Sequence, residues 1–239
     1  MRVDVTSIRH PLARALLVLT FTTGVVDAAS YLGLGHVFAA NMTGNVVLLG
    51  FGIAGSGGLP VVAPLVSLTA FLAGATLGGG LARSMQRHRS AHLSLTLLIE
   101  VSLVAAAALF ALVVDVSPDS FSGDLVIALL ALGMGVRNAA VRRIGIADLT
   151  TTVLTMTLTG LAADSPAAGG SGAGSARKTA AVVAMLGGAI AGALLLKVHL
   201  ALVLVAAALL ALLTWIVYVP AALAADRDDR GAAGDTGSR

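Results

Sequence analysis

Three ionisable residues stand inside long apolar runs of the sequence, and they are the first candidates for chemistry. In helices that cross a membrane, Asp27 and Arg137 would each lie roughly 20 Å deep from opposite faces, and Glu100 roughly 10 Å from the inner face. A charge near the bilayer centre costs at least ~2.5–3.5 kcal/mol, so such side chains need partners. Depth therefore favours an Arg137–Glu100 ion pair and leaves Asp27 free to bind a solute, a cation or a proton. The alternative is an ion-pair cluster that only fixes helix packing.

Two other apolar runs, 36–55 and 146–163, are interrupted by small polar residues. A break at Gly44 would expose backbone groups that need polar partners or a solute. The threonines of the second run fit either an extended piece or one helical stripe, and their hydroxyls would equally serve helix packing. Asn41 and Asn45 would share one helical face. The polar residues singled out in these runs are Asn41, Thr43, Gly44, Asn45, Thr152 and Thr155.

The composition indicates the elements that must position these residues. Hydrophobic residues make up 57% of the chain, charged residues 11%, and the mean hydropathy is +0.96. These values are typical of an all-α polytopic membrane protein rather than of a soluble domain. The basic residues lie at segment ends instead of on one soluble face, so nucleic-acid binding is not expected. The chain has no cysteine, and its histidines lack metal-site spacing, so neither a metal nor a cofactor is expected.

The distribution of basic residues predicts the topology. If the runs 36–55 and 146–163 do not cross, thirteen of the fifteen basic residues lie inside and only Lys197 lies outside. The positive-inside rule therefore favours six transmembrane helices plus two broken or re-entrant segments, with a cytoplasmic N-terminus. The expected parts are a cytoplasmic head (1–14), a first membrane repeat (15–114), an external loop (115–124), a second repeat (125–223) that contains a flexible cytoplasmic loop (165–178), and a disordered tail (224–239).

The two membrane halves resemble each other. GVVDAA at 24–29 matches GVRNAA at 135–140, which sets Asp27 opposite Asn138. The segments 70–83 and 184–197 are identical at six of fourteen positions. Self-similarity at a nearly constant offset indicates an internal repeat. With three crossings in each half, the repeats are expected to be inverted, a transporter layout in which broken segments meet near the midplane.

Two glycine pairs recur at equivalent positions of the halves. Gly74 and Gly78 in the first half correspond to Gly188 and Gly192 in the second. Small residues four apart let helix backbones approach closely. We expect these pairs to pack helices together, either between the halves or between two copies in a homo-oligomer.

The stretch 24–50, GVVDAASYLGLGHVFAANMTGNVVLLG, resembles the YoaK family, bacterial integral membrane proteins grouped as a domain of unknown function. The resemblance covers about residues 12–222 and rests on Asp27, His36 and the segment from Asn41 to Asn45. The second half departs from it, because relatives tend to show Thr-Gly-Thr or Thr-Gly-Asn where this chain has Thr155-Met156-Thr157. The resemblance implies a multi-pass protein of the bacterial cytoplasmic membrane and carries no activity.

Two functions follow from these patterns. The first is a secondary transporter or a channel for a small solute or ion, and the second is a structural, assembly or regulatory membrane protein whose polar centre only specifies packing. No sequence motif of an enzyme is present, so an enzyme is not expected. A water-accessible cavity that joins the two broken segments would favour transport. The candidate substrate-binding residues are Asp27, Asn41, Thr43, Gly44, Asn45, Arg137, Asn138, Thr152 and Thr155.

Overall fold

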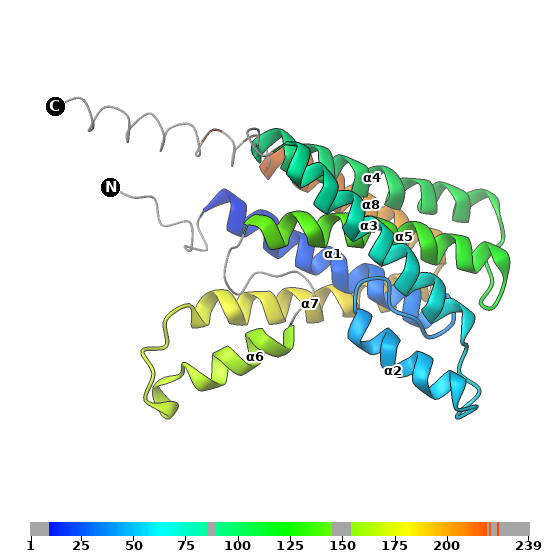
Figure 1. Cartoon of the computed structure of the whole chain (residues 1–239), viewed down its shortest axis with the longest axis horizontal. Coiled ribbons are helices and arrows are strands. Elements are labelled where there is room, and N and C mark those ends of the chain that lie inside the picture. Colours follow the sequence, from blue (N-terminus) through cyan, green and yellow to red (C-terminus); the bar gives the residue numbers. More distant parts are fainter. Residues whose placement is uncertain (1–9, 86–88, 145–153, 219, 221–223, 225–239) are drawn as a thin grey trace.

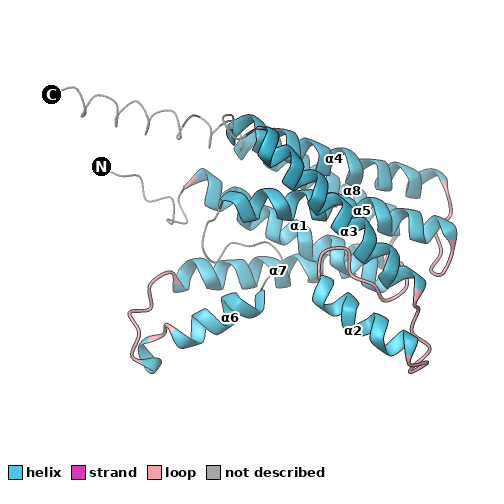
Figure 2. Cartoon of the chain, viewed as in Figure 1, coloured by secondary structure: helices cyan, strands magenta, loops and turns pink. Residues whose placement is uncertain are grey.

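A computed structural model of the 239-residue chain describes residues 10–85, 89–144, 154–218, 220 and 224. Helices dominate the described residues, and no strand occurs among them (Figure 2). Most of the expected head and tail, and Thr152, lie outside the described residues. The helices are α1 (Pro11–Gly33), α2 (Met42–Ile53), α3 (Val62–Ser84), α4 (Arg89–Val113), α5 (Phe121–Ile144), α6 (Leu154–Ala163), the 3₁₀ turn η1 (Pro166–Ala168), α7 (Ser175–Leu196), α8 (Leu200–Leu213) and the π-helical turn η2 (Thr214–Tyr218).

Six of these helices are long and apolar enough to cross a membrane, namely α1, α3, α4, α5, α7 and α8 continued into η2. The other two, α2 and α6, have 12 and 10 residues, too short to span a hydrocarbon core of about 30 Å. The prediction of an all-α polytopic membrane protein is therefore confirmed. The short helices fall on the two runs that the sequence predicts to be broken.

The six long helices form one bundle, and the two short helices diverge from it (Figure 1). The start of α1 and the end of η2 lie at the same end of the bundle, whereas the loop between α4 and α5 lies at the other end. Both short helices begin near the middle of the bundle and run toward opposite ends. α2 packs against α3 and α6 packs against α7, and most of their residues stay exposed.

Histidine side chains cap the starts of two helices. His10 precedes the proline that begins α1, and its Nδ1 accepts a hydrogen bond from the Leu12 N–H at 3.2 Å. His199 caps α8 in the same way, accepting from the Ala201 N–H at 3.1 Å. The first backbone N–H groups of a helix have no partner within the helix, so these rings satisfy donors that would otherwise be unpaired. The histidines at these two segment ends thus have a structural task.

Backbones approach closely where α3 crosses α5 and where α1 crosses α7. A Cβ at Gly74 would overlap the Leu132 carbonyl, and a Cβ at Gly188 would overlap the Phe21 carbonyl. Gly78 and Gly192 repeat the pattern one turn further on, where an added Cβ would lie 2.8 Å from a carbonyl oxygen of the facing helix. Leu132 and Phe21, whose carbonyls face these glycines, occupy equivalent positions when the two halves of the sequence are aligned. The internal repeat stays a prediction, which these matched contacts support.

Candidate substrate site

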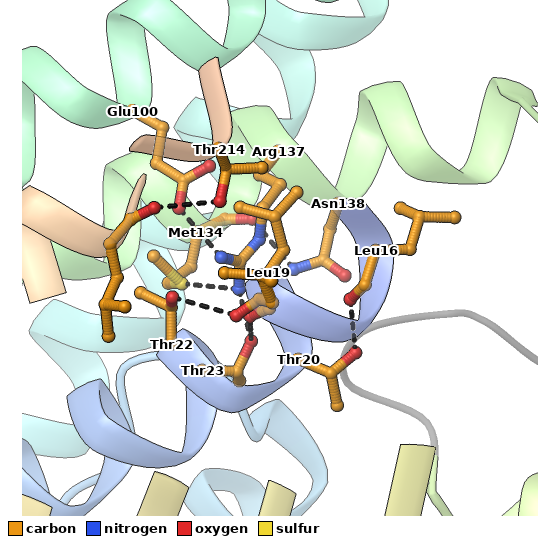
Figure 3. Close-up of polar contacts among 12 residues, drawn as sticks. Leu16, Leu19, Thr20, Thr22, Thr23, Glu100, Met134, Arg137, Asn138 and Thr214 are labelled. Atoms are coloured by element: carbon orange, nitrogen blue, oxygen red, sulfur yellow. Dashed lines mark hydrogen bonds and ion pairs between the residues drawn. The ribbon is translucent and has the colours of Figure 1, made fainter. Parts of the chain in front are cut away.

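Arg137 is fully buried, and Figure 3 shows the polar contacts of its guanidinium. Its Nη1 donates to Glu100 Oε1 at 2.8 Å, and Glu100 is also fully buried. Its Nη2 donates to the Thr23 hydroxyl of α1 and contacts the Met134 sulfur at 3.0 Å. One guanidinium therefore joins α5 to α4 and to α1, and the two opposite charges neutralise each other inside the bundle.

The pair is only partly hydrogen-bonded. Glu100 Oε2 and Arg137 Nε have no hydrogen-bond partner within the described ranges. The threonines beside them do not fill this gap, because Thr20, Thr22 and Thr23 donate to carbonyls four residues back in α1. The attraction between the two charges therefore offsets most of the free-energy cost of removing them from water.

The structure gives Asp27 a different task from the one that the sequence suggests. Its Oδ1 accepts backbone N–H groups from Ala39 at 3.1 Å and from Ala40 at 2.9 Å, and its side chain is 5% exposed. Ser30 Oγ also accepts from the Ala39 N–H at 3.1 Å. Non-helical backbone inside a membrane must be satisfied by protein groups. Asp27 therefore holds the loop before α2 against α1 through its Oδ1.

Asn45 clamps the same loop from its other side. Its Oδ1 accepts from the Phe38 N–H at 2.8 Å, and its Nδ2 donates to the Phe38 carbonyl at 2.6 Å. The amide also donates to Ser67 Oγ of α3 at 3.0 Å. Asn45 is fully buried, so it fixes the loop instead of lining a cavity. The loop leaves α1 through Gly35 and His36, both with positive φ angles, which turn the chain back toward the middle of the bundle.

A pocket of about 410 Å³ lies at the start of α2 and reaches α6. Asn41 is the N-cap of α2 and accepts from the Gly44 N–H at 3.4 Å, and Thr43 is exposed beside it. Thr155, in the first turn of α6, completes the polar lining. Polar residues of both broken segments thus line the same pocket. The lining residues are Tyr31, Phe38, Asn41, Thr43, Gly44, Val47, Leu48 and Thr155.

Several sequence candidates lie outside this pocket. Arg137 and Glu100 are enclosed by the bundle, and Asn138 donates to the Met134 carbonyl at 2.8 Å and lines a second groove. Thr152 lies outside the described residues. Within the described ranges, no group of three His, Asp or Glu side chains is placed to hold a metal ion.

The sequence analysis missed two aromatic residues of the pocket. Tyr31 and Phe38 stack with their ring centroids 4.7 Å apart, and both line the cavity. A Cβ at Gly44 would lie 2.8 Å from the Phe38 ring, so this glycine lets α2 approach the aromatic wall. The sequence could have indicated both aromatic residues, because they lie between the candidates Asp27 and Asn41, one on each side of Gly35.

The chain matches the family described as "Protein of unknown function (DUF1275)" over residues 15–217. It is also similar to the UPF0700 transmembrane protein YoaK of Bacillus subtilis (strain 168), with 37% identity over 153 residues. This alignment covers 62% of the chain and 65% of the relative, so the chain matches less than two thirds of that protein's length. No solved structure matches the chain. Because the family model covers most of its length, the chain belongs to the DUF1275 family, and the YoaK resemblance of its sequence is confirmed.

Proposed function

We propose that the protein is a secondary transporter or a channel for a small polar solute, with the α2–α6 pocket as its central site. The observation that carries the proposal is the position of this pocket at the starts of two half-length helices, one from each half of the chain. Its volume of about 410 Å³ falls within the range of about 300–1,000 Å³ that small-molecule sites occupy.

The lining favours a solute that carries oxygen atoms. Asn41, Thr43 and Thr155 supply amide and hydroxyl groups, and none of the lining side chains that the structure describes is charged at neutral pH. The N-terminal end of α2 adds the positive end of its helix dipole. Half-helix N-termini of this kind bind anionic groups in transporters built from inverted repeats. A neutral polar solute or a small anion therefore fits this lining better than a cation.

The proposed scaffold is a pair of inverted repeats in the bacterial cytoplasmic membrane. Thirteen of the fifteen basic residues then lie on the cytoplasmic side, which follows the positive-inside rule. Matched glycine contacts join two helices of the first half, α1 and α3, to two helices of the second half, α7 and α5. These contacts support two repeats in which each half packs against helices of the other. Motion of α2 and α6, which pack on α3 and α7 respectively, would open the pocket to either side.

A structural or regulatory role is the second candidate, and the charge cluster favours it. Asp27, Glu100 and Arg137 are all bonded to other groups of the protein, as packing residues would be. This cluster lies apart from the pocket, so it does not argue against transport through the pocket itself.

Water access at the pocket distinguishes the two candidates. Because the chain has no cysteine, Thr43→Cys and Thr155→Cys can each be treated with an impermeant, water-soluble thiol reagent in membranes. A transport pathway predicts labelling at both positions. Val46→Cys is the matched control, since Val46 lies on the same helix as Thr43, is 58% exposed and does not line the pocket; we expect it to face lipid and to stay unlabelled.

Absence of labelling at both threonine positions, from either side of the membrane, would exclude an aqueous pathway. Labelled variants can then be compared with unlabelled ones in cells that accumulate solutes from a defined panel. Loss of uptake of one solute on labelling identifies the substrate class, because the reagent blocks the pocket.

A further inference from the structure

A second groove of about 530 Å³ lies between α3 and α5, at the end of the bundle where both helices finish. Arg83, Arg142 and Arg143 line the groove near the ends of α3 and α5, and all three are exposed. We call these three arginines the rim of the groove. Its floor is built from small or apolar side chains. Among the described residues, the lining is Phe71, Ala75, Gly79, Ala82, Arg83, Asn138, Ala139, Arg142 and Arg143.

The groove has the dimensions of a lipid tail. From Phe71 to Arg83 it follows α3 for twelve residues, about 18 Å at 1.5 Å per residue. One leaflet of a hydrocarbon core measures about 15 Å. The floor is open because a Cβ at Gly79 would meet no atom within 4 Å. An acyl chain can therefore lie along the floor while its headgroup stays at the rim.

The rim carries three positive charges, and no carboxylate lines the groove among the residues that the structure describes. On α3 there is no acidic residue, Asp124 of α5 lies at the opposite end of that helix, and Glu100 of α4 is engaged by Arg137. None of the three rim arginines forms an ion pair with a residue in the described part of the chain. Guanidinium groups bind phosphate oxygens through paired hydrogen bonds, so the rim matches a phosphate.

The other half of the chain shows that packing does not require this charge. The repeat alignment sets Arg142 and Arg143 opposite Tyr31 and Leu32, and Arg83 opposite Lys197. Where α1 crosses α7 the helices make the same glycine contacts, yet one cation stands in place of three. The cluster of arginines is therefore a feature of one end of the bundle and not of the helix crossing.

We infer that this groove binds an anionic phospholipid, with the lipid phosphate held by Arg83, Arg142 and Arg143 and one acyl chain laid along Phe71, Ala75 and Gly79. Basic pockets between transmembrane helices bind anionic headgroups, and each arginine near the surface contributes about a fivefold gain in affinity. The site is separate from the α2–α6 pocket and does not depend on the function proposed for that pocket.

Native mass spectrometry of the full chain in detergent tests this inference, by counting bound phosphatidylglycerol and phosphatidylcholine with identical acyl chains. We expect phosphatidylglycerol to bind at least about fivefold more tightly, and the Arg142→Gln, Arg143→Gln double variant to lose this preference. Gly79→Leu should abolish binding, because its side chain occupies the floor at a position where the added Cβ meets no atom within 4 Å.

Two controls separate the groove from general effects of charge and volume. Gly80→Leu alters the next residue, which is also open but does not line the groove, and Lys197→Gln removes the equivalent charge at the other end. Both should bind lipid as the wild type does. Equal binding of the two lipids, or the same loss in Gly80→Leu as in Gly79→Leu, would overturn the inference. So would displacement of the lipid by inorganic phosphate, which indicates a soluble anion site. The arginine variants alter exposed side chains, so they test the rim even if Gly79→Leu fails to fold.

Discussion

Alanine at Gly74 should destabilise the protein, whereas alanine at Gly80 on the same helix should not. At Gly74 the added Cβ would overlap the Leu132 carbonyl of α5, while at Gly80 it would meet no atom within 4 Å. A rotamer change cannot relieve an overlap between a Cβ and a backbone carbonyl. The two helices must therefore move apart and lose the contacts that hold them together in a membrane, where packing replaces the hydrophobic effect.

The two substitutions should change the free energy of unfolding in opposite directions. Alanine in place of a helical glycine contributes up to about 1 kcal/mol of helix propensity. Gly80→Ala should show this gain. At Gly74 overpacking costs about 1–3 kcal/mol, which leaves a net loss of up to about 2 kcal/mol. Gly188→Ala should behave like Gly74→Ala, because its Cβ would overlap the Phe21 carbonyl of α1.

The assay is equilibrium unfolding of the purified variants in one detergent, with identical lipid content. If Gly74→Ala is as stable as Gly80→Ala, then α3 and α5 are not in backbone contact, and the proposed exchange of helices between the halves loses its main support. If Gly188→Ala alone is destabilised, the two crossings are not equivalent and the repeat interpretation fails.

Three further predictions concern the charges, the loop and the topology. Arg137→Gln should cost about 3–5 kcal/mol because it strands Glu100, and the double variant with Glu100→Gln should recover most of this loss; a silent single variant in the unfolding assay would refute the pairing. Asp27→Ala should cost about 1–3 kcal/mol and loosen the loop, because the Ala40 N–H loses its acceptor and the Ala39 N–H keeps only Ser30 Oγ, whereas Asp27→Asn should cost less; hydrogen exchange at Ala40 reports this, and unchanged protection there would contradict it. In intact cells an impermeant thiol reagent should label Ser117→Cys, in the α4–α5 loop, and not Ser171→Cys, before α7; the reverse pattern would invert the topology.

The architecture was predictable because span length, hydropathy and the placement of arginines are properties of the sequence alone. Depth counting also brought Arg137 within reach of Glu100, since both lie on helices whose ends the sequence marks with charge. The same counting left Asp27 without a partner. Its partners are backbone N–H groups, which every residue carries, and only the path of the loop shows which ones lie near a carboxylate.

The four-residue spacing of Asn41 and Asn45 predicts that they share one helical face, and the structure does not have this arrangement. Asn41 is the N-cap, with φ −93° and ψ 79°, so it is outside the helix and the four-residue rule does not apply. The chain also breaks before α2 and not at Gly44, which lies within the helix. For Thr155, Thr157 and Thr159, helix α6 decides between the two conformations that the sequence left open, and Thr159 donates to the Thr155 carbonyl at 2.9 Å.

Polar residues at the centre of this protein divide into two tasks, and the division follows from the membrane. A loop that turns back inside a bilayer exposes backbone groups, and protein side chains must satisfy them. Asp27 and Asn45 do this at the loop before α2, and both are buried as a result. Asn41 and Thr43 lie on the same loop and helix start but stay exposed in the pocket. Asn41 also caps α2 through its bond from the Gly44 N–H, whereas Thr43 takes no part in the clamp, so substituting Thr43 should alter binding of the proposed solute without loosening the loop.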